Sequence, residues 1–73
     1  MYTNYFRLKA QVDLQAQKVN GLKLNLAIAR RDDNQRAILH WAPRLAAAEA
    51  DLVEARWILE TDPEVMEELE ESN

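Results

Sequence analysis

Few side chains in this chain of 73 residues could carry out catalysis. The sequence has one histidine, His40, no cysteine, and aliphatic hydroxyl groups on Thr3, Thr61 and Ser72. Activating such a hydroxyl as a nucleophile requires a base held beside it, and the local sequence supplies none in a suitable arrangement. A single glycine also excludes a glycine-rich loop that binds phosphate. We therefore predict that the protein is not an enzyme.

Five glutamates near the C-terminus have spacings that would bring several carboxylates to one side of a helix, where they could bind a cation. They are Glu60, Glu64, Glu67, Glu68 and Glu71. Acid-rich tails are more commonly solvated or used as interaction segments. We interpret His40, next to Trp41, as flanking a helix kink. The sequence therefore predicts no metal ion and no cofactor.

The C-terminal half carries two apolar stripes at helical spacing. The first consists of Ile38, Trp41, Leu45, Ala48, Leu52, Ala55 and Leu59. The second consists of Leu39, Ala46, Ala50, Val53 and Trp57, with Ala42 between the two stripes. A two-stranded sheet can cover one stripe. The second stripe is then either part of a broad core, with Trp57 under another element, or a surface for a second copy or a target protein. Tryptophan is favoured at binding hot spots, which supports association.

Three aromatic side chains, Tyr2, Tyr5 and Phe6, lie close together at the N-terminus. They either close one end of the core or form an exposed patch for a partner. Together with the second stripe they define a candidate protein-binding set. Its members are Tyr2, Tyr5, Leu39, Val53 and Trp57.

The net charge of −4 conceals a division along the sequence. Residues 1–31 contain six Lys or Arg side chains and one acid, a net charge of +5, whereas residues 32–73 contain three arginines and twelve acids, a net charge of −9. Such asymmetry usually concerns partners rather than fold. Five basic residues could contact nucleic acid or an acidic surface: Arg7, Lys9, Lys23, Arg30 and Arg31. No aromatic residue alternates with them to stack on bases, so a solvated basic face is the other interpretation.

The elements that position these residues follow from the apolar pattern. Apolar and polar residues alternate over 6–17 and again over 22–29, on either side of Asn20-Gly21, which predicts a β-hairpin over about 6–30. The apolar faces of the two strands match if Val19, Asn20 and Gly21 form a three-residue loop with Gly21 in the left-handed region. The leading fold class is therefore α+β, with this hairpin packed on a long helix.

An all-α antiparallel helical hairpin is the alternative. Ala, Gln, Leu, Lys and Arg favour helix, and apolar residues also occur in a heptad pattern with one polar exception, Gln15. This pattern comprises Tyr5, Leu8, Val12, Val19, Leu22, Leu26 and Ala29. Against it, Phe6, Leu14, Leu24 and Ile28 would lie off the packed side, and Gly21 would stand in mid-helix at a cost of about 1 kcal/mol.

The second half predicts a long helix over about 33–60, beginning with a capping box in which Asp32 precedes Gln35 by three residues. Pro43 should kink or break it near Trp41, because proline cannot donate a backbone hydrogen bond. Asp62, Pro63 and Glu64 predict the start of a short acidic helix. We expect one small domain over 1–61, followed by an acidic tail over 62–73.

These features favour a small, non-enzymatic protein that binds and regulates or inhibits a larger cytosolic machine. Chains of this size and charge are typical of products that phages and plasmids direct against host transcription or defence, an analogy based on size. We expect a cytoplasmic protein whose partner is a larger protein or complex, with homodimerisation possible and no membrane segment. Nucleic-acid binding through the basic residues and self-assembly as a structural coiled-coil module are the alternatives.

Overall fold

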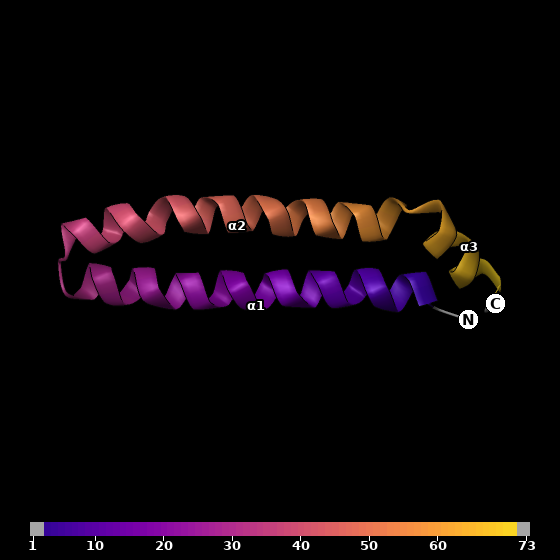
Figure 1. Cartoon of the computed structure of the whole chain (residues 1–73), viewed down its shortest axis with the longest axis horizontal. Helices are drawn as coiled ribbons and strands as arrows, with labels where there is room; N and C mark the ends of the chain where they lie inside the picture. The colour runs from indigo at the N-terminus through magenta and orange to yellow at the C-terminus, as the bar shows by residue number, and fades with distance from the viewer. Residues whose placement is uncertain (1–2, 72–73) are drawn as a thin grey trace.

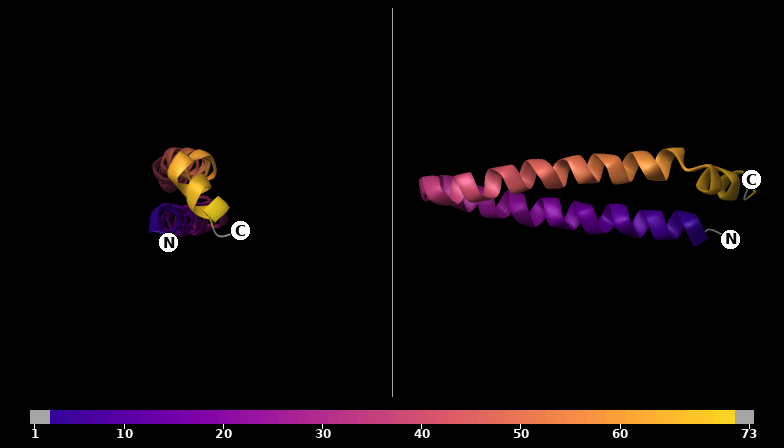
Figure 2. Two further views of the ribbon diagram at one scale, coloured as in Figure 1. Left: turned by 90° about the vertical axis from the view of Figure 1, so that its right-hand side faces the viewer. Right: turned by 45° about the horizontal axis from the view of Figure 1, so that its top comes forward.

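The computed structural model describes residues 3–71, which form three helices. Helix α1 spans Thr3–Arg31, α2 spans Gln35–Thr61 and α3 spans Pro63–Glu71. Helices α1 and α2 run antiparallel, side by side, in a rod of 53 × 14 × 14 Å (Figure 1). The short helix α3 turns back across the open end of this hairpin, next to the start of α1 (Figure 2).

The β-hairpin expected over about 6–30 is wrong, because no strand occurs anywhere between Thr3 and Glu71. The all-α alternative describes the fold correctly. The segment that alternates in sequence lies within the continuous helix α1, and Gly21 occupies an ordinary helical position rather than the left-handed region. Residues with high helix propensity outnumber β-branched residues in this segment, which favours the helix.

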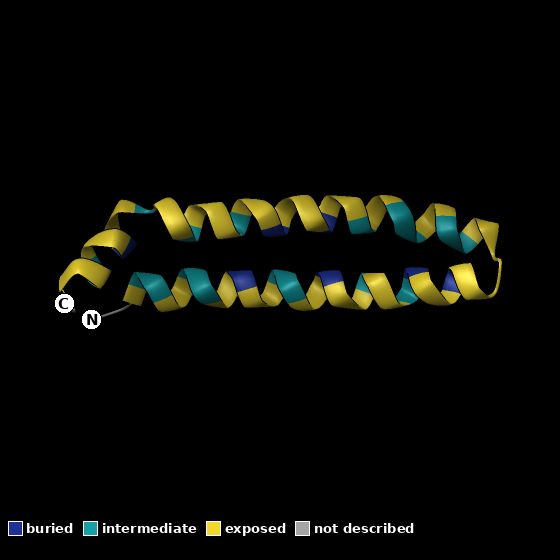
Figure 3. Ribbon diagram, turned by 180° about the vertical axis from the view of Figure 1, so that it is seen from behind, coloured by how far each residue is buried: buried dark blue, intermediate teal, exposed yellow. Residues whose placement is uncertain are grey.

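The core is a narrow seam between α1 and α2. Val12, Val19 and Leu26 are buried at seven-residue intervals along α1, and the first two cluster with Ala48 and Leu52 of α2. Figure 3 shows the buried and half-buried residues of each long helix on the side that faces the other helix. Burying a Val or Leu side chain contributes about 1.5–3 kcal/mol. A few such residues must therefore stabilise the whole hairpin.

The alternation that resembles a strand has its origin in two apolar stripes on α1. Leu14, Leu24 and Ile28 are 59%, 62% and 41% exposed, and at 100° per residue they lie opposite the buried valines. Phe6 is also largely exposed. The helix is consequently apolar on its inner and its outer side. Two interleaved stripes of this kind produce a period-2 pattern in the sequence without a sheet.

The turn between α1 and α2 closes the end of one helix and begins the next. The backbone N–H of Asp33 donates to the carbonyl of Arg30 and that of Asn34 to the carbonyl of Ala29, which is the Schellman arrangement. Asp33 takes the left-handed conformation that this arrangement requires, with a φ of 50°. The Asn34 side chain then accepts from the N–H of Ala37. The cap of α2 is therefore Asn34, and the capping box expected at Asp32 is wrong.

Helix α2 continues through Pro43, so the break expected near Trp41 does not occur. Proline has no N–H, so the helical hydrogen bond to the carbonyl of Leu39 is missing there.

The start of α3 agrees with the helix start predicted from the sequence. Asp62 caps it by accepting from the N–H groups of Glu64 and Val65.

A substitution at Gly21 tests the helical conformation of α1. A Cβ atom built on Gly21 meets no atom within 4 Å, and the residue is exposed. Gly21→Ala should therefore raise the free energy of unfolding by about 1 kcal/mol through higher helix propensity. Urea unfolding followed by circular dichroism measures this change. The matched variant Ala27→Gly, at another exposed α1 position, should lower stability by a similar amount; destabilisation by Gly21→Ala would instead indicate a turn.

Candidate functional site

The outward side of α2 presents a line of apolar side chains, which we call the outer α2 face. It consists of Leu39, Pro43, Ala46, Ala50, Val53 and Trp57. The members alternate in steps of four and three residues, so they lie along one side of the helix. Leu39, Val53 and Trp57 are 75%, 65% and 63% exposed. Three large apolar side chains on one helix face are a candidate binding surface.

The core seam explains why the rest of the hairpin leaves this face uncovered. Leu45, Ala48 and Leu52 pack toward α1, and the outer α2 face lies about 150° around the helix from them. A single helix such as α1 can cover only one side of α2. Helix α3 contributes its buried Val65 at the open end of the hairpin and leaves Trp57 mostly exposed.

The candidate protein-binding residues do not form a single patch. Leu39, Val53 and Trp57 share the outer α2 face, as the sequence predicted from their spacing. Tyr5 lies on α1, half-buried, with its ring in edge-to-face contact with Phe6 at a centroid distance of 5.4 Å. Tyr2 lies outside the described residues.

The acidic tail binds within its own chain, a contact that sequence reasoning missed. The Glu68 carboxylate accepts from the backbone N–H groups of Asn4 and Tyr5, both at 3.0 Å. The Asn4 side chain donates to Glu64 at 2.7 Å. The first N–H groups of a helix lack partners within that helix and carry partial positive charge, so a carboxylate is well suited to them. The Glu68 carboxylate of α3 therefore caps α1.

These hydrogen bonds determine the ionisation of Glu68. Partial desolvation acts to raise its pKa, whereas the N–H groups of Asn4 and Tyr5, the charge of the N-terminus and the Asn4 side chain stabilise the charged carboxylate and lower it. The pKa of Glu68 consequently lies below the ordinary value of a glutamate. The ionised form of Glu68 therefore strengthens the contact between α3 and α1.

Three of the five basic residues share one side of α1, where Lys9, Lys23 and Arg30 follow one another at intervals of fourteen and seven residues, but they are widely spaced along its length. Lys9 and Lys23 are about 21 Å apart along the axis, at 1.5 Å per residue, and the adjacent Arg30 and Arg31 point in directions about 100° apart. Lys9 pairs with Asp13 at 2.8 Å, a hydrogen bond that raises the pKa of the lysine, and Arg31 contacts Asp32 at 3.2 Å. The β-hairpin face expected to carry these residues is wrong, because they lie on a helix. Their contact with nucleic acid or an acidic surface stays a prediction. Arg7, the remaining member of the set, is exposed.

Folding the chain into a hairpin converts the charge division of the sequence into one along the rod. The half near the turn, residues 18–47, holds six Lys or Arg and two Asp, a net charge of +4. The half near the open end, residues 3–17 and 48–71, holds three Lys or Arg and eleven Asp or Glu, a net charge of −8. The protein is thus an elongated electric dipole.

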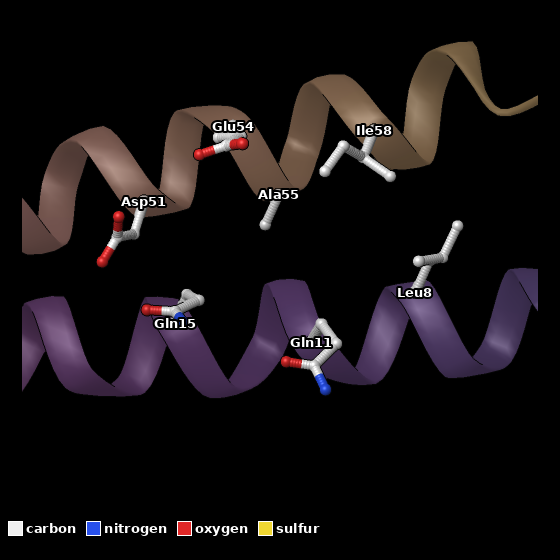
Figure 4. Close-up of a pocket in the computed structure, with 7 residues that line it drawn as sticks. All are labelled: Leu8, Gln11, Gln15, Asp51, Glu54, Ala55 and Ile58. Atoms are coloured by element: carbon white, nitrogen blue, oxygen red, sulfur yellow. The ribbon is translucent and has the colours of Figure 1, made fainter.

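A cavity of about 270 Å³ lies between the two long helices (Figure 4). Its lining consists of Leu8, Gln11, Gln15, Asp51, Glu54, Ala55 and Ile58. Carboxylates and amides provide acceptors there, but the lining includes no hydroxyl, thiol or imidazole that could act as a nucleophile. The Gln15 Oε1 atom is buried and has no hydrogen-bond partner among residues 3–71. Within the same residues, no group of three or more His, Cys, Asp or Glu side chains could hold a metal ion.

Comparisons with protein-family models, with curated proteins and with solved structures return no match for this chain. Among the described helices, none combines the length and the apolar character needed to cross a membrane.

The contact of Glu68 with α1 predicts a local pH dependence. Since the pKa of this residue is lowered by folding, its contribution to stability is complete above the ordinary glutamate pKa and is lost as the pH falls through the lower, folded-state value. Glu68→Gln should therefore speed amide exchange in the first turn of α1 at neutral pH and remove the acid-dependent change there. Amide hydrogen exchange followed by NMR measures both effects.

Glu67→Gln provides the matched control, because Glu67 is exposed and removing its charge alters the net charge equally. Equal exchange rates in the two variants would contradict the assigned role of Glu68.

Proposed function

We propose that this chain is a non-enzymatic protein-binding hairpin that regulates a larger cytosolic protein or complex by occupying part of its surface. The observation that carries the proposal is the exposure of Leu39, Val53 and Trp57 along one face of α2. Leaving such side chains in water forgoes about 1.5–3 kcal/mol each relative to burial. A binding partner that covers the outer α2 face would recover this free energy.

The geometry of the face supports recognition of another protein. Tryptophan is enriched at interface hot spots, and its effect is greatest where surrounding contacts exclude water. The outer α2 face is presented by a helix whose other side is packed in the core, so little chain ordering is needed on binding. The small alanines between the large residues leave room for a helix to approach closely.

Nucleic-acid binding has less support from this arrangement. Lys9, Lys23 and Arg30 share one side of α1 but extend over about 32 Å along its axis. Two of the five candidate residues, Lys9 and Arg31, already contact aspartates. A basic surface that follows a phosphate backbone requires closely spaced cations that are not already paired with acids.

The double variant Val53→Asp/Trp57→Asp tests the proposal. Both side chains are exposed, so the helical content measured by circular dichroism should stay unchanged, while binding to partner proteins should fall at least tenfold. Affinity capture from a lysate of the source organism, with bound proteins quantified by mass spectrometry, measures the loss.

The matched control is Leu14→Asp/Leu24→Asp, which introduces the same charges on the outer side of α1. This variant should keep the captured proteins. Capture that depends on Leu14 and Leu24 but survives the α2 substitutions would contradict the assignment of the outer α2 face.

A further inference from the structure

The outer α2 face is symmetric about its centre. Leu39 and Trp57 lie nine residues on either side of position 48, Pro43 and Val53 lie five residues away, and Ala46 and Ala50 lie two residues away. All six side chains are exposed. A helix with this symmetry presents the same spacing when it is turned end over end. It can therefore pair with a copy of itself running in the opposite direction.

We propose that the occupant of this face is a second copy of the chain, docked with the two α2 helices antiparallel across a two-fold axis near position 48. This inference rests on the same exposed face as the proposed function and goes beyond it, because a second copy on this face would compete with the larger partner. In this register Leu39 meets Trp57 of the second copy, Pro43 meets Val53, and Ala46 meets Ala50. The alanines let the two backbones approach closely at the centre, and the large side chains fill the ends.

Charges at the ends of the face complement each other in the same register. Arg36 and Glu60 lie twelve residues on either side of position 48 and continue the steps of three and four residues. Both are exposed. Antiparallel docking therefore sets Arg36 of each copy opposite Glu60 of the other, whereas parallel docking would bring like charges together at both ends.

The charge division along the rod favours the same orientation. With two copies antiparallel, each turn half of net charge +4 lies beside an open half of net charge −8. Parallel copies would instead bring the two −8 halves together, within the range of about 8 Å over which charges act at physiological ionic strength. Electrostatic complementarity of this kind suppresses the wrong orientation.

One contact opposes association and provides an independent test. Glu49 is exposed at the edge of the face, one residue from its centre, so the two Glu49 carboxylates approach each other near the two-fold axis. Glu49→Gln removes this repulsion and should tighten self-association about threefold at low salt. Sedimentation equilibrium measures the dissociation constant for both proteins. Unchanged or weaker association in Glu49→Gln would contradict the register.

Disulfide trapping tests the orientation directly, because the chain has no cysteine of its own. Ala46→Cys and Ala50→Cys are prepared separately at exposed positions and oxidised alone and as an equal mixture. The proposed register brings position 46 of one copy next to position 50 of the other, so the mixed disulfide should predominate in the mixture. Two copies of the same variant have their cysteines about 6 Å apart along the axis, beyond the usual disulfide geometry.

The outcomes separate this inference from the proposed function. Sedimentation as a dimer, with the mixed disulfide, supports the second copy. A wild-type protein that remains monomeric at about 0.1 mM, a concentration well above most functional dissociation constants, would overturn it. Disulfides that form within each variant alone would also overturn it, in favour of a parallel pair. In either case, loss of captured proteins by Val53→Asp/Trp57→Asp would leave the proposed function standing.

Discussion

The packing of α1 against α2 through one narrow seam is the constraint on which the rest of the structure depends. Val12 and Val19 of α1 pack with Ala48 and Leu52 of α2. The rod is only 14 Å across, so no further helix lies over the outer sides of these two. Each long helix can thus bury one side, and every apolar residue outside the seam remains at the surface. The outer α2 face and the exposed leucines of α1 are direct results of this geometry. A chain of this size with so small a core gains substantially from a partner.

Hydrogen-bonded caps, rather than further apolar packing, close the two ends of the seam. At the turn, the left-handed Asp33 ends α1 and Asn34 begins α2. At the open end, Glu68 supplies the acceptors that the first turn of α1 lacks. These caps restrict fraying where the apolar contacts stop, and they assign the acidic tail a structural role. Its carboxylates also make the open end strongly negative, so the same residues stabilise the hairpin and determine how two copies can approach.

The heptad spacing of α2 and the Asp62-Pro63 start of α3 could be predicted from the sequence because local rules determine them. The conformation of the first thirty residues could not, because apolar residues occur at period 2 and at period 3.5 in the same segment. Strand formation would have buried Phe6, Leu14 and Leu24, and the helix leaves them exposed. Exposed apolar side chains are unfavourable for an isolated chain. The sequence pattern therefore favoured a strand, in which these side chains would be buried. The cap by Glu68 joins residues more than sixty positions apart and has no local signature. The line of Leu39, Val53 and Trp57, in contrast, followed from spacing alone.

The placement of Asn20 and Gly21 inside α1 affects the chemical ageing of the protein. In flexible chains, an Asn-Gly step deamidates spontaneously when the glycine nitrogen attacks the side-chain carbonyl carbon and closes a succinimide ring. Within α1 the Gly21 nitrogen takes part in the helical hydrogen-bond ladder and is directed along the axis, away from that carbon. Ring closure must therefore wait until this part of the helix opens. Conversion of Asn20 to aspartate or isoaspartate would accumulate at a rate set by these openings, and it would add a negative charge to the middle of the rod.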